Sequence, residues 1–193
     1  MKMYSFFYNW PEMKSVAIYC GSAFGRPEYT RVAYDVGKTL ALRGIRIVYG
    51  GTRAGLMGKV ADAALENGGQ VVGVIPDFLG KLEAMHGGLT EIHVVETLQQ
   101  RKLKMVELAE GVIALPGGYG TLDELFEVLV WSQLGIFGGP VGILNTNGFY
   151  DHLLAHLDRA LDEQFLRPGN RAVVRVHEEI EGLLSGMIRF AAL

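Results

Sequence analysis

Cysteine is nearly absent from the sequence, since Cys20 is the single one in a chain of 193 residues. One thiol cannot form an intramolecular disulfide, so the fold is not a disulfide-stapled scaffold, and the composition suits a reducing compartment. We therefore expect a cytoplasmic protein. At this length, with 49% hydrophobic residues, the chain can bury a core that needs neither a disulfide nor a structural metal.

Long apolar runs and basic clusters are also missing. No window approaches the roughly 18 consecutive apolar residues of a membrane span. The opening residues 1–13 lack the apolar stretch and cleavage site of a signal peptide. The formal net charge is −3, and the 18 Lys and Arg residues are scattered rather than gathered into a stripe. We expect no membrane and no nucleic-acid partner, and a small-molecule ligand instead.

Short β-rich runs alternate with segments of helical period from residue 15 onward. We expect seven strands, at 15–20, 45–50, 70–75, 91–95, 111–115, 140–144 and 172–176. We expect helices at 27–43, 55–67, 97–109, 121–135, 148–165 and 177–190. Strands rich in Val and Ile that are separated by helices predict a Rossmann-like, doubly wound α/β fold, with a mainly parallel sheet covered by helices on both faces.

The sequence shows no linker, internal repeat or low-complexity tract. We therefore expect one α/β domain over residues 15–193. Residues 1–14 are expected to form an N-terminal arm that packs on this domain or on a partner subunit.

Glycine is concentrated where strands are expected to end. Ligands of such sheets bind beyond the carboxyl ends of the strands, where the chain turns into the next helix. These turns read CGS (20–22), GGTRAG (50–55), PD (76–77) and PGGYGT (116–121). A glycine-rich turn that enters a helix exposes backbone N–H groups to an anion. We expect the turns to meet at one anion-binding crevice.

Two familiar phosphate-binding motifs are present only in part. GKT (37–39) resembles the end of a P-loop, but Val32 stands where the first glycine is required, and the segment has a helical pattern. Gly118 and Gly120 have the spacing of a dinucleotide fingerprint, but Asp123 replaces its third glycine. The sequence therefore lacks the usual signatures for ATP or NAD.

Charged residues near the last turn have two interpretations each. Thr121 and Glu124 form T-x-x-E, a capping box at a helix start, yet a carboxylate at the mouth of such a loop can also act in catalysis. Arg101 and Lys102 follow a strand by half a dozen residues and form either a solvated helix face or a phosphate contact. Both pairs of alternatives remain open on spacing alone.

The sequence gives little support for a metal site or for a nucleophilic cysteine. His152 and His156 are four residues apart on an expected helix, but neither the acidic partner of HExxH nor a third ligand lies nearby. We expect no metal site. Cys20 follows a strand without an assignable His and Asp, so a partly buried thiol is favoured over a nucleophile.

Four segments together are similar to one known family. They are YGGTRAGLMGKVADAAL (49–65), RK (101–102), PGGYGTLDE (116–124) and WSQLGIFGGPVGILNTNGFYDHLL (131–154). The chain resembles the Lonely Guy family of cytokinin riboside 5′-monophosphate phosphoribohydrolases from about residue 15 to 190. Members were formerly labelled possible lysine decarboxylases, a reaction that requires a pyridoxal phosphate lysine, and none is identifiable here.

The resemblance implies hydrolysis of the N-glycosidic bond of purine nucleoside 5′-monophosphates, either cytokinin-type or AMP-like, without cofactor or metal. The family's catalytic arginine and glutamate fall on Arg101 and Glu124. The implied substrate contacts are Ser22, Gly50, Gly51, Gly55, Lys102 and the phosphate loop Gly117, Gly118, Gly120 and Thr121. A non-catalytic nucleotide or molybdenum-cofactor carrier, a relative of this fold, is the alternative.

The sequence departs from the family pattern at two positions, and the resemblance also implies an oligomer. Gln99 stands where the family usually has histidine, and Thr52 replaces the third glycine of YGGG. Both departures concern substrate preference and rate more than reaction type. Family members are generally dimers or larger assemblies, and the helix with Val128, Leu129, Trp131 and Leu134 carries surplus apolar surface, so we expect a homodimer or higher homo-oligomer.

Overall fold

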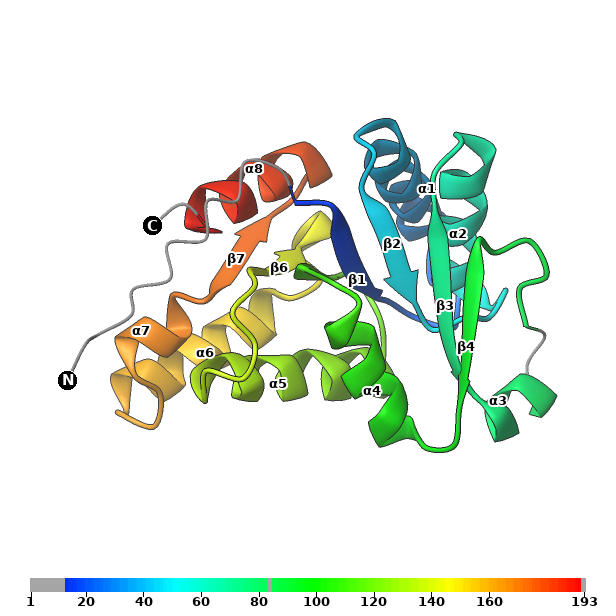
Figure 1. Ribbon diagram of the computed structural model, residues 1–193. Helices are drawn as coiled ribbons and strands as arrows, with labels where there is room; N and C mark the ends of the chain where they lie inside the picture. Colours follow the sequence, from blue (N-terminus) through cyan, green and yellow to red (C-terminus); the bar gives the residue numbers. More distant parts are fainter. Residues whose placement is uncertain (1–12, 83–84, 192–193) are drawn as a thin grey trace.

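A single seven-stranded sheet organises the molecule (Figure 1). The computed structural model describes residues 13–82 and 85–191. The expected N-terminal arm therefore lies almost wholly outside the described residues. The strands are β1 (Ser15–Tyr19), β2 (Arg46–Tyr49), β3 (Val71–Pro76), β4 (Glu91–Val95), β5 (Gly111–Ala114), β6 (Val141–Leu144) and β7 (Val174–His177).

All neighbouring strands are parallel, in the order β4-β3-β2-β1-β5-β6-β7. The seven predicted strands and the doubly wound sheet are thus confirmed. The chain adds strands outward from β1 in one direction and then, from β5 on, in the other. The order reverses between β1 and β5, which is where sheets of this type bind their ligands.

Long helices cover both faces of the sheet (Figure 1). One buried cluster joins β1 and β2 to α1 (Pro27–Leu42), α2 (Gly55–Glu66) and α8 (Ile180–Ala191). The opposite cluster joins the sheet to α4 (Leu98–Glu107), α5 (Tyr119–Gln133) and α6 (Asp151–Asp162). Successive strand residues alternate between the clusters, Val16 and Ile18 in the first and Ala17 and Tyr19 in the second.

Three short helical elements were not predicted. They are α3 (Asp77–Leu82), α7 (Pro168–Arg171) and a 3-10 turn at Thr146–Gly148. Each is too short to show a helical period in the sequence. The expected helices at 121–135, 148–165 and 177–190 begin instead at Tyr119, Asp151 and Ile180.

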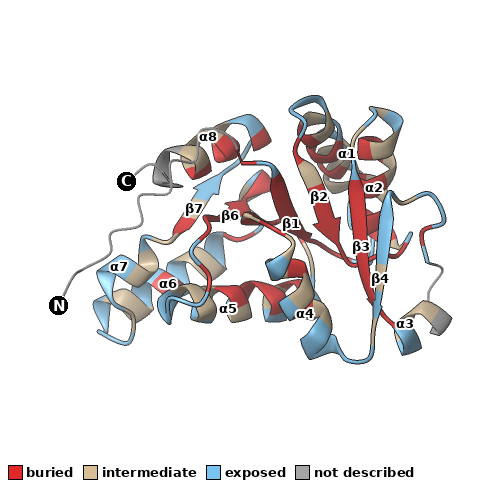
Figure 2. Ribbon diagram, viewed as in Figure 1, coloured by how far each residue is buried: buried red, intermediate tan, exposed pale blue. Residues whose placement is uncertain are grey.

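The GKT segment lies within α1, as predicted. Gly37 faces α2 so closely that a side chain there would overlap the backbone of Val60. Among the described residues no helix is long and apolar enough to cross a bilayer. The inner strands are buried along their length, whereas the edge strand β4 is largely exposed (Figure 2).

Candidate active site

A pocket of about 220 Å³ lies beyond the carboxyl ends of β1 and β5. Its walls come from the turns after β1, β2 and β5, from the start of α5, and from single residues of α2, α3 and α4. The lining residues are Cys20, Gly21, Ser22, Gly50, Thr52, Met57, Leu79, Arg101, Gly118, Tyr119, Gly120, Thr121 and Glu124. The glycine-rich turns therefore meet at the point where the strand order reverses.

Backbone contacts hold these turns together. The N–H of Gly21 donates to the carbonyl oxygen of Pro116 at 3.1 Å, and the N–H of Leu56 donates to that of Gly21 at 3.0 Å. Gly55 and Gly117 allow this approach, because a side chain on Gly55 would overlap Ser22 and one on Gly117 would overlap the backbone nitrogen of Gly21. These two glycines bring the turns into contact.

Helix α5 begins without a side-chain cap. Its N-cap residue is Gly118, and no side chain accepts a hydrogen bond from its first turn. The capping-box interpretation of Thr121 and Glu124 is therefore wrong, because the N-cap is Gly118, three residues before the position that the motif requires. The leading N–H groups of a helix lack intrahelical partners, and with the helix dipole they favour an anion. These groups belong to pocket-lining residues.

A capping box does form at α4, where the sequence analysis did not identify one. The hydroxyl of Thr97 accepts from the N–H of Gln100 at 3.1 Å, and the Gln100 amide oxygen accepts from the N–H groups of Thr97 and Glu96 at 3.3 and 2.8 Å. The signal was T-x-x-Q at 97–100. Arg101 follows directly, so the cap fixes the turn from which it projects.

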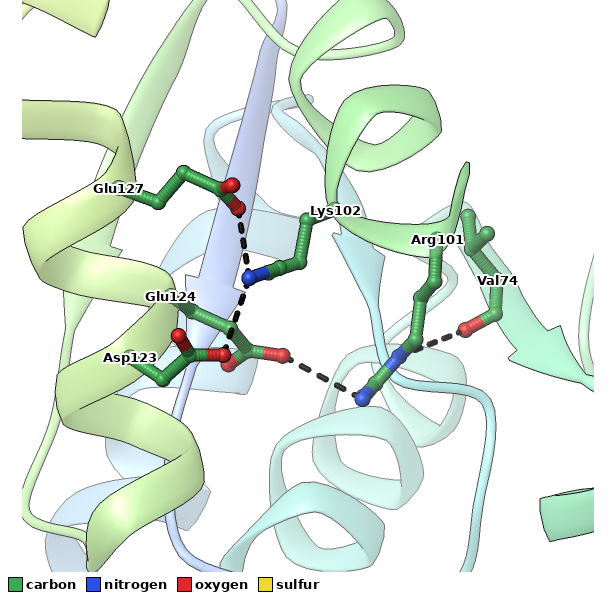
Figure 3. Close-up of polar contacts among 6 residues, drawn as sticks. All are labelled: Val74, Arg101, Lys102, Asp123, Glu124 and Glu127. Atoms are coloured by element: carbon green, nitrogen blue, oxygen red, sulfur yellow. Dashed lines mark hydrogen bonds and ion pairs between the residues drawn. The ribbon is translucent and has the colours of Figure 1, made fainter. Parts of the chain in front are cut away.

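Arg101 and Glu124 meet across the pocket (Figure 3). The Arg101 Nη1 lies 3.4 Å from the Glu124 Oε1, and its Nε donates to the carbonyl oxygen of Val74 at 3.2 Å. The two side chains are only 13% and 10% exposed. The guanidinium occupies space beside Gly50 that a side chain there would fill. Gly50 thereby makes room for Arg101.

Glu124 has an altered acidity. Burial raises the pKa of its carboxyl group to about 7, against the opposing effect of Arg101. Asp123 and Glu127 raise this pKa further, and Lys102 lowers it. A carboxyl group with a pKa near neutrality can both accept and release a proton in a reaction. Burial also raises the pKa of the neighbouring Cys20 thiol, which is buried as expected.

The structure gathers most of the predicted site residues at this pocket. Those lining it are Ser22, Gly50, Arg101, Gly118, Gly120, Thr121 and Glu124, whereas Gly51, Gly55, Lys102 and Gly117 do not line it. Gly117 lines an adjoining cavity of about 290 Å³. Met57, Leu79 and Tyr119 also line the pocket and were not predicted, because their hydrophobic side chains carry no functional signal in a sequence.

The two departures from the family pattern differ in position. Thr52 is buried in the pocket wall, and its hydroxyl accepts from the N–H of Ala54 at 3.3 Å. Gln99 is exposed and does not line the pocket. Among the described residues no group of three or more His, Cys, Asp or Glu side chains is placed to hold a metal ion. The expected absence of a metal stays a prediction.

Comparison with known proteins agrees with this architecture. A family model described as "Possible lysine decarboxylase" matches residues 57–187. A cytokinin riboside 5′-monophosphate phosphoribohydrolase from Rhodococcoides fascians is 48% identical, over 92% of this chain and 90% of that protein. The chain belongs to the Lonely Guy family. A cytokinin riboside 5′-monophosphate phosphoribohydrolase from rice is 45% identical to this Lonely Guy chain, over 83% of the chain and 67% of that protein.

Solved structures extend the comparison of the fold. The molybdenum cofactor binding protein of Rippkaea orientalis matches this Lonely Guy protein with a TM-score of 0.71, over 93% of this chain and 98% of that one. The molybdenum cofactor carrier protein of Chlamydomonas reinhardtii matches with a TM-score of 0.70, over 94% and 100%. Their identities of 19% and 18% show a common fold and nothing about activity.

Proposed function

We propose that the protein hydrolyses the N-glycosidic bond of purine nucleoside 5′-monophosphates, of cytokinin type or AMP-like, to give free base and ribose 5-phosphate. The observation that carries this proposal is the buried Arg101–Glu124 pair, which faces the uncapped start of α5 in the pocket. The names of the relatives from Rhodococcoides fascians and rice support the same reaction.

The 5′-phosphate would bind at the start of α5, on the N–H groups around Gly118, Gly120 and Thr121. Glu124 lies three residues beyond Thr121 and so on the same side of the helix. A substrate held by its phosphate therefore presents its ribose to the Glu124 carboxylate. Binding energy from the unreacting phosphate thus serves to orient the reacting sugar.

Cleavage breaks the bond between the base nitrogen and the anomeric carbon of the ribose. As this bond stretches, the ribose gains oxocarbenium character, which the ionised Glu124 would stabilise. Glu124 would also accept a proton from the attacking water and later release it to solvent, while the departing base nitrogen takes up a proton from solvent, so that one water molecule is consumed. Arg101, which contacts Val74 and Glu124, would bind phosphate or balance charge on the leaving base.

The older family description, a lysine decarboxylase, does not fit the pocket. Such an enzyme holds pyridoxal phosphate on a lysine as a Schiff base. No lysine is among the described residues that line the pocket. Lys102, next to the catalytic candidate Arg101, instead pairs with Asp123 and Glu127. The described residues that line this pocket therefore include no lysine that could form that Schiff base.

A direct test follows base release from AMP and from isopentenyladenosine 5′-monophosphate by chromatography. We expect release by the wild type, a loss of about 100-fold or more in Glu124→Gln, and no change in Glu163→Gln, an exposed carboxylate on the distant end of α6. Adenosine, which lacks the phosphate, should be cleaved far more slowly. Tight nucleotide binding without base release would instead favour the carrier alternative.

A homodimer and a cytoplasmic location complete the proposal. The apolar residues Leu103 of α4 and Leu134 and Ile136 at the end of α5 are exposed, and Leu103 and Ile136 line one cavity; we call these three residues the α4–α5 surface. Of the apolar residues named from sequence, Val128 is buried in the core and Leu134 is exposed. A second copy of the chain would cover this surface. Cell fractionation followed by immunoblotting tests the location, and recovery in a membrane or secreted fraction would contradict it.

A further inference from the structure

Lys102 is buried beside the pocket without lining it. Its side chain is 11% exposed, and its Nζ lies 3.0 Å from the Asp123 Oδ2 and 2.8 Å from the Glu127 Oε2 (Figure 3). The neighbouring Arg101 faces Glu124 and Val74 instead. Burial lowers the pKa of Lys102, but its hydrogen bonds to Glu127 and Asp123 raise this pKa by more. The net effect is a raised pKa, so the ammonium group is charged at neutral pH.

The two partners of Lys102 flank Glu124 on α5. Asp123 precedes Glu124 by one residue, and Glu127 follows it by three. Helix α4 therefore contacts α5 through two adjacent charged groups, Arg101 to Glu124 and Lys102 to the residues on either side of it. An ammonium group that is largely buried between two carboxylates is held in position, because moving away from them would leave its buried charge unpaired.

We propose that Lys102 is a positioning residue that holds α5 against α4 through Asp123 and Glu127, and so keeps the Glu124 carboxylate opposite Arg101 without touching the substrate. This inference rests on the proposed function, in which Glu124 and Arg101 act on the nucleotide. It assigns Lys102 a different role from the substrate contact that the family resemblance implies.

The local charges give the proposal a measurable consequence. The charged and titratable groups that act on Glu124 are Arg101 and Lys102 of α4, Asp123 and Glu127 of α5, and Tyr19 and Cys20 at the end of β1. Without Lys102, three neighbouring carboxylates share one cation. Their repulsion favours protonation of Glu124 and separates α5 from α4. Both effects act against an ionised Glu124 in contact with Arg101.

The first experiment compares Lys102→Met and Lys102→Arg with Lys104→Met, which removes a more exposed lysine from the same helix. For AMP hydrolysis we expect Lys102→Met to lower kcat by about 10- to 100-fold, as misplaced catalytic groups do, with little change in KM. Its activity should also need a higher pH than that of the wild type. Lys102→Arg should retain most activity, and Lys104→Met should match the wild type.

A second variant covers the case in which Lys102→Met does not fold. The double variant Lys102→Met with Glu127→Leu removes one like charge together with the lysine and replaces a buried ion pair by apolar groups. Its pH profile should return toward that of the wild type. A higher KM with unchanged kcat and pH profile in Lys102→Met, or no rescue in a folded double variant, would overturn the proposal in favour of a direct substrate contact.

A measurement on the free protein separates this proposal from the proposed function. The Glu124 carboxyl signal in ¹³C NMR, assigned by its loss in Glu124→Gln, should titrate at higher pH in Lys102→Met than in the wild type. Absence of base release by the wild type would refute the proposed function alone. An unchanged Glu124 titration in folded Lys102→Met would refute the positioning role, whatever the enzyme hydrolyses.

Discussion

Glu124 is the residue at which activity and stability should respond to pH in opposite directions. Burial raises its pKa from 4.5 to about 7 in the folded protein, so between these two pH values the folded state holds a proton that the unfolded state has released. The contribution to stability is present below pH 4.5 and is lost as the pH rises through 7. The ionised form that the proposed reaction needs accumulates over the same interval.

We expect Glu124→Gln to be more stable, relative to the wild type, at pH 8 than at pH 5. Its free energy of unfolding minus that of the wild type should therefore increase between these two pH values. The gain should be on the order of 1–3 kcal/mol, since one pKa unit corresponds to about 1.4 kcal/mol. Chemical denaturation at the two pH values measures it. A difference between the two proteins that does not vary with pH would show that Glu124 titrates normally.

Wild-type activity should rise with pH through about 7, because ionised Glu124 is the form proposed to stabilise the ribose cation. The measurement is kcat for AMP hydrolysis between pH 5 and pH 9. Activity that falls over this interval would indicate that the protonated carboxyl group, acting as an acid, is required instead.

Gly50 should be necessary for activity and not for folding. A methyl group at this position would overlap the Arg101 guanidinium, yet Gly50 does not have a left-handed backbone, so the main chain accepts alanine. We expect Gly50→Ala to displace Arg101 and to lower kcat/KM by about 10- to 100-fold. The control Gly186→Ala, which adds a methyl group in open space on α8, should leave kcat/KM unchanged. Normal kcat/KM in Gly50→Ala would mean that Arg101 has an alternative position.

At the scale of single elements, α4 depends on its capping box. We expect Thr97→Ala to lower the free energy of unfolding by about 1 kcal/mol, the usual cost of losing an N-cap. Because Arg101 and Lys102 project from the turn that the cap fixes, kcat should fall as well. Gln100→Glu preserves the box, since glutamate serves there equally, and both its stability and its kcat should stay near those of the wild type. An unchanged kcat in Thr97→Ala would show that the rest of the fold suffices to place Arg101.

Helices and strands were predictable where each was long enough to show the repeat of its own type. Alternation of β-rich and helical segments predicted all seven strands and the long helices because each spans enough residues to show its period. Helix α3 is too short to do so, although it supplies Leu79 to the pocket. A capping box was one of two interpretations of Thr121 and Glu124, and the structure has one at Thr97 instead, since the same spacing pattern is compatible with a helix start or a helix interior.

At the scale of the whole molecule, the α4–α5 surface should mediate self-association. Leu134 and Ile136 are 64% and 65% exposed and lie at the end of the helix that carries Glu124. We expect Ile136→Lys to convert a homodimer to monomer in analytical ultracentrifugation. The control is Leu42→Lys, which changes an equally exposed leucine at the end of α1. A wild-type protein that sediments as a monomer would contradict the homodimer.

The sequence by itself determined the order of strands and helices, the glycine-rich turns at the strand ends, and the family resemblance that marks Arg101 and Glu124. Periodicity and turn chemistry are local properties, so they can be seen in a linear string. Only the tertiary structure decided that Arg101 faces Glu124 while Lys102 faces Asp123 and Glu127. These pairs join residues more than 20 positions apart, and only the packing of α4 and α5 on the sheet brings them together.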